Sequence, residues 1–145
     1  MESRSLILNR KELAAMPSKN IKAVPTSDYI AVIEVVDNYV AGLKVGDSKR
    51  VANSFHKDAT MYGFSPDGAL LGGQISNLWS YMDTHGPAHN IVTHNDIISI
   101  TPTTAVVKVD MEKDAAGIDY TDNHTLLKQD GKWLIIVKVF HVWGA

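Results

Sequence analysis

Three polar side chains of this sequence have the chemistry and the placement to contact a ligand: Tyr39, Asn123 and Lys138. In a dry pocket, the Tyr39 hydroxyl can donate a hydrogen bond to a ligand oxygen. A partly buried Lys138 can bind an acidic ligand group or, when uncharged, act as a base. Two plainer alternatives stay open. Tyr39 would then be a core tyrosine bonded to a backbone carbonyl, and Lys138 would pair with a nearby carboxylate.

The pairing of Asn123 with Lys138 is predicted from a hairpin turn. Asp130-Gly131 separates two β-prone runs, and this dipeptide favours a two-residue turn with positive φ at both positions. Counting outward from the turn places Asn123 opposite Lys138, on a face that also carries Phe140. A slip of one residue would turn Lys138 to the other face of the sheet.

The opposite face of the same hairpin is predicted to carry a contiguous apolar patch among other residues. It would carry Ile135, Val137 and Val139. Because monomers rarely expose a contiguous apolar patch of this kind, we expect a homodimer formed through this face.

Two further residues are candidates for the wall of a pocket. Met61 lies in a predicted strand and Trp79 in a predicted amphipathic helix. An aromatic residue on such a helix is also a common core residue, which is the alternative for Trp79. A cavity plugged by Met61, Trp79 and Phe140 would favour an interaction module, whereas converging polar groups would favour an enzyme.

The elements that position these residues follow from the hydrophobic periodicity. Residues 1–25 are predicted to form an N-terminal arm, and residues 26–145 a single domain. The domain would contain helices at 27–44, from Asp47 to Phe55 and at 74–84, and strands at 59–64, 91–100 and 104–112 followed by the hairpin. Helices that precede a run of strands indicate an α+β fold with a mostly antiparallel sheet.

Composition narrows the possible partners. The 145 residues are 45% hydrophobic and 21% charged, with a net charge of −2 and no cysteine. This balance gives no reason to expect nucleic acid or a membrane surface as a partner. The apolar run from Leu6 to Leu8 is too short for a signal peptide, so we expect a cytoplasmic protein. The six histidines show no metal-ligand spacing, and we predict neither a metal nor a cofactor.

Three stretches resemble the nuclear transport factor 2-like superfamily: YVAGLKVGD from Tyr39, FHKDATM from Phe55 and LKQDGKWLIIVKVFH from Leu127. The last is most similar to the putative lumazine-binding subgroup. The resemblance covers about Ser27 to Val142 and implies a curved sheet wrapped around helices to form a cone with an internal pocket. The superfamily includes isomerases, dehydratases, cyclases and non-catalytic domains, so the fold leaves the activity open.

Ketosteroid isomerase is also similar to this fold, and it combines an aspartate base with a tyrosine and a protonated aspartate that donate hydrogen bonds to an oxyanion. The resemblance puts Tyr39 at its oxyanion-binding tyrosine, Gly63 at its proton-abstracting aspartate and Asn123 at its protonated aspartate. Because Gly63 has no carboxylate, we do not expect the isomerase reaction.

The sequence therefore predicts a protein that binds a small organic ligand through Tyr39, Met61, Trp79, Asn123, Lys138 and Phe140. The catalytic hypothesis is a lyase or isomerase that acts on a carbonyl-bearing or acidic compound. The alternative is a non-catalytic module for dimerisation or protein interaction.

Overall fold

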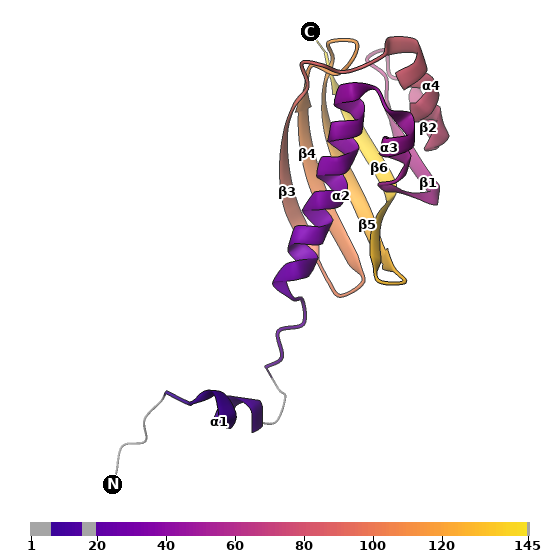
Figure 1. The fold of residues 1–145 in the computed structure, drawn as a ribbon. Coiled ribbons are helices and arrows are strands. Elements are labelled where there is room, and N and C mark those ends of the chain that lie inside the picture. Colours follow the sequence, from indigo (N-terminus) through magenta and orange to yellow (C-terminus); the bar gives the residue numbers. More distant parts are fainter. Residues whose placement is uncertain (1–6, 16–19, 145) are drawn as a thin grey trace.

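The protein is an α+β fold in which a single curved sheet packs against helices (Figure 1). The computed structural model describes residues 7–15 and 20–144. Its elements are α1 (Arg10–Ala15), α2 (Thr26–Val45), α3 (Ser48–Ala52), β1 (Phe55–Phe64), β2 (Leu70–Gln74), α4 (Ser76–His85), β3 (Val92–Ile100), β4 (Thr104–Glu112), β5 (Asp119–Gln129) and β6 (Lys132–Trp143). The predicted order of helices and strands is confirmed.

The long helix α2 crosses one face of the sheet (Figure 1). It ends at Gly46, whose left-handed conformation (φ 73°) lets its N–H bond to the last carbonyls of the helix. The next residue, Asp47, caps α3, because its side chain accepts a hydrogen bond from the Arg50 N–H at 3.1 Å. This capping fixes the sharp turn between α2 and α3.

The sheet has the strand order β2-β1-β6-β5-β4-β3. β1 and β6 are parallel, and the other neighbouring pairs are antiparallel. The inner face of the sheet, which faces α2, carries Ala105, Val107 and Val109, all essentially inaccessible to solvent. These residues and the apolar side of α2 form the core below the functional site.

The hairpin turn is confirmed, since φ is 52° at Asp130 and 76° at Gly131. The predicted register is confirmed as far as the pair Leu126–Ile135 and is wrong beyond that pair. Leu126 pairs with Ile135 but Thr125 pairs with Val137, so Ile136 is an extra residue that forms a β-bulge.

The bulge changes which side chains face inward. Lys138 lies opposite His124, and Asn123 lies opposite Val139. Asn123 is exposed, whereas His124 and Lys138 are buried. Ile135 was expected on the outer face, but it lies on the inner face and is fully buried.

A polar link joins the hairpin to the start of α2. The Asp28 carboxylate accepts hydrogen bonds from Lys128 Nζ at 3.1 Å and from Trp133 Nε1 at 3.3 Å. The hydrogen bond from Lys128 is the largest cause that lowers the pKa of Asp28. This link holds the helix that carries Tyr39 against the sheet.

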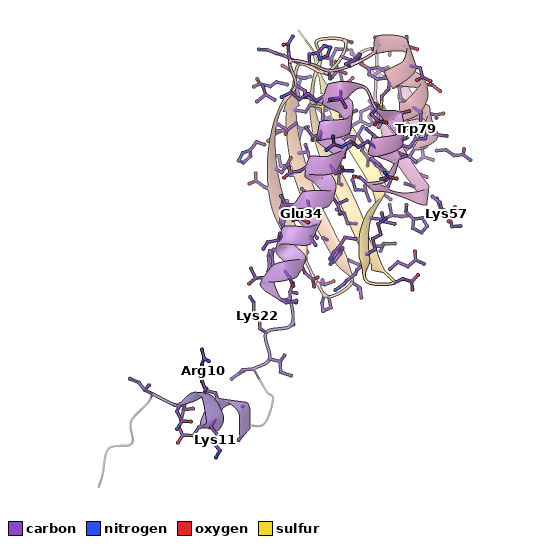
Figure 2. All side chains as sticks on the ribbon, in the orientation of Figure 1. Arg10, Lys11, Lys22, Glu34, Lys57 and Trp79 are labelled. Atoms are coloured by element: carbon purple, nitrogen blue, oxygen red, sulfur yellow. The ribbon has the colours of Figure 1, made fainter. Side chains whose placement is uncertain are left out.

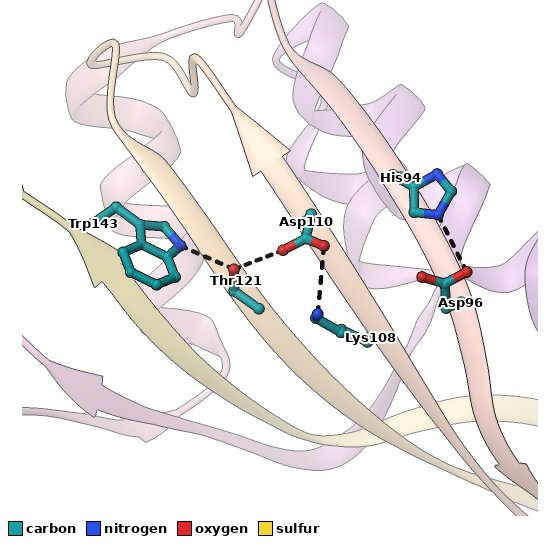
Figure 3. A network of polar contacts seen from close by, with 6 residues as sticks. All are labelled: His94, Asp96, Lys108, Asp110, Thr121 and Trp143. Carbon is teal, nitrogen blue, oxygen red and sulfur yellow. Dashed lines mark hydrogen bonds and ion pairs between the residues drawn. The ribbon is translucent and has the colours of Figure 1, made fainter.

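The outer face of the sheet is polar where β4 lies beside β5, and it exposes apolar residues where β1 lies beside β6. Figure 3 shows its polar part, where Trp143 Nε1 donates to Thr121 Oγ1 at 2.9 Å and the Thr121 hydroxyl donates to Asp110 at 2.7 Å. Lys108 pairs with the same carboxylate at 3.7 Å. On β1 and β6, the paired residues Tyr62 and Val139 are 42% and 47% exposed.

The described part of the predicted N-terminal arm contains α1. Asn9 and Glu12 exchange side-chain to backbone hydrogen bonds of 3.0 and 2.8 Å, which cap this short helix. α1 buries none of its residues. Among the described residues, no helix is long and apolar enough to cross a membrane.

Candidate functional site

A cavity of about 180 Å³ lies between the inner face of the sheet and helices α2 and α4. Its walls are mostly apolar, with side chains that include Leu43, Met61, Leu78, Met82, Met111 and Phe140. Besides Asn77, two groups of polar residues interrupt this lining: Tyr39, Asp122 and Lys138 form one, and Tyr81, Asp114 and Tyr120 form the other. We call the first group, together with His124 behind it, the buried cluster, and the second the tyrosine cluster. An apolar cavity with a few polar groups is the usual form of a small-molecule site.

Asp122 is the centre of the buried cluster. It lies on β5, is 1% exposed and lines the cavity. Its Oδ2 is 3.5 Å from His124 Nε2 and 3.8 Å from Lys138 Nζ. Its Oδ1 is buried and has no hydrogen-bond partner among the described residues. A buried oxygen of this kind is uncommon and marks a place where a ligand group can bind.

Two opposing effects determine the charge of Asp122. Burial alone would raise the pKa of its carboxyl group. The positive charge of Lys138 and the hydrogen bond from His124 outweigh burial and hold this pKa below its ordinary value. Asp122 is therefore a carboxylate as long as Lys138 remains beside it.

His124 is completely buried behind Asp122. Burial lowers the pKa of its imidazole more than the neighbouring Asp122 raises it, so the ring is neutral near pH 7. With its proton on Nε2, the ring donates to Asp122. Its Nδ1 then has no hydrogen-bond partner in the part of the chain that the structure describes.

The structure shows for Lys138 the ion pair that was the plainer alternative, with Asp122 as the carboxylate, and it also places the side chain in the cavity wall. Its Nζ lies 4.8 Å from the centre of the Phe140 ring, a favourable position for a cation. Because the distance of 3.8 Å to Asp122 exceeds that of a direct hydrogen bond, the ammonium can still bind a ligand oxygen.

Tyr39 reaches the cavity from α2 and is 2% exposed. Its ring packs against Phe55 and His124, with centroids 5.4 and 5.3 Å away. Its hydroxyl forms none of the hydrogen bonds found among the described residues, so the expected bond to a backbone carbonyl is not observed. Burial raises the pKa of Tyr39 well above 10, which keeps the hydroxyl protonated as a donor.

The tyrosine cluster lines another part of the same cavity. Tyr81 on α4 donates a hydrogen bond of 2.6 Å to Asp114, and its oxygen lies 3.4 Å from the Tyr120 hydroxyl. Burial is the main reason that the pKa of Tyr81 is raised, and burial also raises the pKa of Tyr120 to about 12. Both hydroxyls are therefore protonated donors.

The structure brings together some of the predicted site residues. Tyr39, Met61, Lys138 and Phe140 line the cavity. Trp79, labelled on α4 in Figure 2, lies outside that lining and packs edge-on against Phe55 with centroids 6.1 Å apart.

Asn123 also lies outside the cavity lining, because the inward residues of β5 are its neighbours Asp122 and His124, and the bulge in β6 places Lys138 opposite His124. The inward residue is Asp122, so the inferred exchange of an acid for an amide at this position is wrong. One signal in the sequence pointed to the correct residues: Asp122 and His124 alternate in phase with Leu126.

Gly63 leaves no room for a side chain. A Cβ atom there would collide with the Phe140 carbonyl oxygen and with the Phe140 ring. The Phe140 ring therefore occupies the space beside Gly63. Among the described residues, no three His, Asp or Glu side chains are grouped so that they could hold a metal ion.

Residues 27–141 match the protein family described as "Putative lumazine-binding". The chain belongs to this family. A curated relative is the aldolase FrzH from a Cladobotryum species. It is 43% identical over 120 residues, which span 83% of this chain and 95% of the relative.

Solved structures of similar proteins have the same fold. A nuclear transport factor 2-like protein from Shewanella baltica is 30% identical, with a TM-score of 0.78 and coverage of 84% of this chain and 98% of that one. A similar protein from Methylobacillus flagellatus is 34% identical, with a TM-score of 0.77 and coverage of 83% and 96%. The resemblance to the nuclear transport factor 2-like superfamily is confirmed. Both proteins are described as having unknown function.

Proposed function

We propose that this protein is a lyase of the aldolase type, which makes or breaks a carbon–carbon bond next to a carbonyl group. The observation that carries the proposal is that Asp122, whose buried Oδ1 has no hydrogen-bond partner among the described residues, lines an apolar cavity together with Tyr39 and Lys138. These are a base, a neutral donor and a cation, which together suit the formation of an enolate. The 43% identity to an aldolase supports the same chemistry.

In the bond-forming direction, Asp122 Oδ1 removes a proton from the carbon next to the ligand carbonyl. The electron pair moves to the carbonyl oxygen, and the Tyr39 hydroxyl stabilises the resulting enolate by a hydrogen bond. The enolate carbon then attacks a second carbonyl carbon, and the new alkoxide takes the proton back from Asp122. Cleavage follows the same steps in reverse, so no atom or electron is lost.

Lys138 makes Asp122 a stronger base once the ligand is bound. In the free protein, the ammonium stabilises the carboxylate and lowers its pKa. When the ammonium turns to the ligand oxygen, Asp122 loses part of this stabilisation while it remains buried, and its pKa rises. The proton of the ligand is therefore removed at the moment when its carbonyl is polarised.

The walls of the cavity protect the enolate. Met61, Met111 and Phe140 present apolar surface beside the buried cluster. Exclusion of water strengthens the electrostatic contacts and limits protonation of the enolate by solvent. A cavity on which polar groups converge favours an enzyme over a purely structural interaction module.

The proposal is tested by the retro-aldol cleavage of 4-hydroxy-4-phenylbutan-2-one, which yields benzaldehyde and acetone. Wild-type protein should release benzaldehyde, detected by its absorbance, and Asp122→Asn should not. Exchange of the α-hydrogens of acetone in deuterium oxide reports the enolisation step alone. Wild-type protein that catalyses neither reaction faster than Asp122→Asn would overturn the proposal.

A homodimer is the form that we propose for this enzyme in solution. Tyr62, Phe64, Leu127 and Val139 are exposed apolar residues on the outer face of adjacent strands. A second copy that covers this face would remove their apolar surface from water.

A further inference from the structure

The tyrosine cluster is the largest polar group of the cavity that the proposed reaction does not use. The cluster combines Asp114 of the β4–β5 loop, Tyr81 of α4 and Tyr120 of β5. It lines the same cavity as Asp122 and Lys138. The cluster therefore lies where it can contact a second part of any ligand whose carbonyl group meets the buried cluster.

Backbone contacts fix the Asp114 carboxylate in place. Its Oδ1 accepts hydrogen bonds from the N–H groups of Ala116 and Ile118, each at 2.9 Å. Its Oδ2 accepts the Tyr81 hydroxyl at 2.6 Å. The loop between β4 and β5 and helix α4 together hold this carboxylate rigidly, which lowers the entropy cost of recognising a ligand.

No cation among the described residues forms an ion pair with Asp114. In contrast, Asp122 in the buried cluster has Lys138 beside it. The Tyr81 hydroxyl donates to Asp114 Oδ2, and Tyr120 lies close enough for Asp114 to raise its pKa, but neither tyrosine supplies a positive charge. The cavity thus has a neutralised acid in one cluster and an acid without a cation in the other.

The two tyrosines favour a cation beside Asp114. Their hydroxyls stay protonated. Both side chains line the cavity, and a hydroxyl oxygen or an aromatic ring attracts positive charge. A neutral donor would gain a hydrogen bond there, whereas a cation would also gain the attraction of the uncompensated carboxylate.

We propose that the tyrosine cluster binds a protonated amine of the ligand, so that the substrates are carbonyl compounds that carry a basic nitrogen at a distance from the reacting carbonyl. This assignment rests on the proposed function for the position of the carbonyl group at the buried cluster. Asp114 is then the residue that determines specificity, and Tyr81 positions it.

Three ketones that differ in a single group test the proposal: 4-(aminomethyl)acetophenone, which is a cation at pH 7, 4-(hydroxymethyl)acetophenone and 4-methylacetophenone. Their dissociation constants are measured by titration calorimetry without turnover. We expect wild-type protein to bind the aminomethyl ketone about tenfold more tightly than the methyl ketone. Asp114→Asn should lose this preference, and Glu112→Gln should keep it, because Glu112 is exposed and lies outside the cavity lining.

Equal binding of the three ketones, or an unchanged preference in Asp114→Asn, would overturn the proposal. Equal binding of the aminomethyl and hydroxymethyl ketones would show that a neutral donor suffices, which also overturns it. Failure of the aminomethyl ketone to bind wild-type protein at millimolar concentration would also overturn the proposal.

A second measurement needs no variant. The preference for the aminomethyl over the methyl ketone should shrink as sodium chloride rises from about 0.05 to 0.5 M, and a constant preference would contradict the proposal. The result of these binding experiments can be distinguished from the result of the retro-aldol assay. An amine preference without retro-aldol cleavage leaves this inference standing and removes the proposed function, and the reverse result removes only the inference.

Discussion

The Asp122 carboxylate and the Lys138 ammonium lie 3.8 Å apart on adjacent strands, and both side chains are more than nine-tenths buried. A buried pair at this distance has lost its water without gaining the full energy of a short contact. Such a pair contributes little to the stability of the fold by itself. It is well suited to a site in which one partner must be free to turn to a ligand.

Removal of Lys138 alone should destabilise the fold. Lys138→Met leaves Asp122 buried without its cation, and we expect a loss of about 3 kcal/mol in the free energy of unfolding. The double variant Asp122→Asn with Lys138→Met should recover part of this loss, because it removes both charges. Urea denaturation of the wild type, the two single variants and the double variant measures the coupling. If the losses in the free energy of unfolding of the two single variants simply add in the double variant, the two side chains do not interact.

Removal of the Asp122 charge should stop the chemistry. Asp122→Asn has nearly the same shape but cannot accept a proton, so α-hydrogen exchange should fall by about a hundredfold to ten-thousandfold. Asp110→Asn is the matched control, since Asp110 lies on the outer face of the same sheet and bonds to Thr121. An equal loss in both variants would point to a general effect of charge.

The Tyr39 hydroxyl should matter for turnover and little for stability. Because it forms no hydrogen bond with described residues, Tyr39→Phe should change the free energy of unfolding by less than about 0.5 kcal/mol. The same change should lower kcat for retro-aldol cleavage by about a hundredfold, as the loss of an oxyanion donor does elsewhere. A large loss of stability with an unchanged kcat would identify Tyr39 as a core residue only.

Stability should fall in mild acid because of His124. Burial lowers the pKa of the folded-state imidazole below the ordinary 6.5, so the unfolded chain binds more protons in this range. The stabilisation is complete above about pH 6.5 and is lost as the pH falls towards the lowered pKa, with a slope of up to about 1.4 kcal/mol per pH unit. In His124→Gln the slope should flatten, and in His89→Gln, an exposed control, it should not. Unfolding midpoints in urea from about pH 7 to about pH 5 provide the measurement.

The proposed dimer predicts the effect of a charge on the outer face. Val139 is 47% exposed and lies beside Tyr62. Val139→Lys should shift the protein from dimer to monomer in light scattering at micromolar concentration, because a buried lysine without a partner is costly. Lys132→Glu, at the exposed hairpin turn, is the control. A monomeric wild-type protein would contradict the prediction.

The elements of the fold were predictable from local sequence. Gly46 ends a helix, Asp47 caps the next, and Asp130-Gly131 forms the turn, because each has a conformational preference that nearby residues do not override. The inward-facing residues beyond the turn were not predictable by counting. A bulge depends on how neighbouring strands twist and pack, and nothing in the LIIVKV run distinguishes an extra residue from a regular one.

The candidate site was therefore predicted in part. Tyr39 lines the cavity as helix periodicity predicted. Lys138 also lines it, but it faces inward because of the bulge and not through the regular register from which its position was predicted. Asp122 and His124 were missed because the expected register placed them outside. The tyrosine cluster was missed because its members are far apart in sequence, and only the closure of the β4–β5 loop against α4 brings Tyr81 to Asp114.

The unpaired residue in β6 also determines how the length of this strand can vary. Ile135 and Lys138 both face inward although they are three positions apart, which strict alternation forbids. Deletion of Ile136 would bring them two positions apart and would leave every inward side chain facing inward. Deletion of Ile135 gives the same sequence, and deletion of Val137 likewise leaves a single residue between an inward isoleucine and Lys138. Relatives that lack one residue in this strand are therefore best aligned with the gap within residues 135–137, and their Lys138 and Phe140 equivalents then stay in the cavity wall.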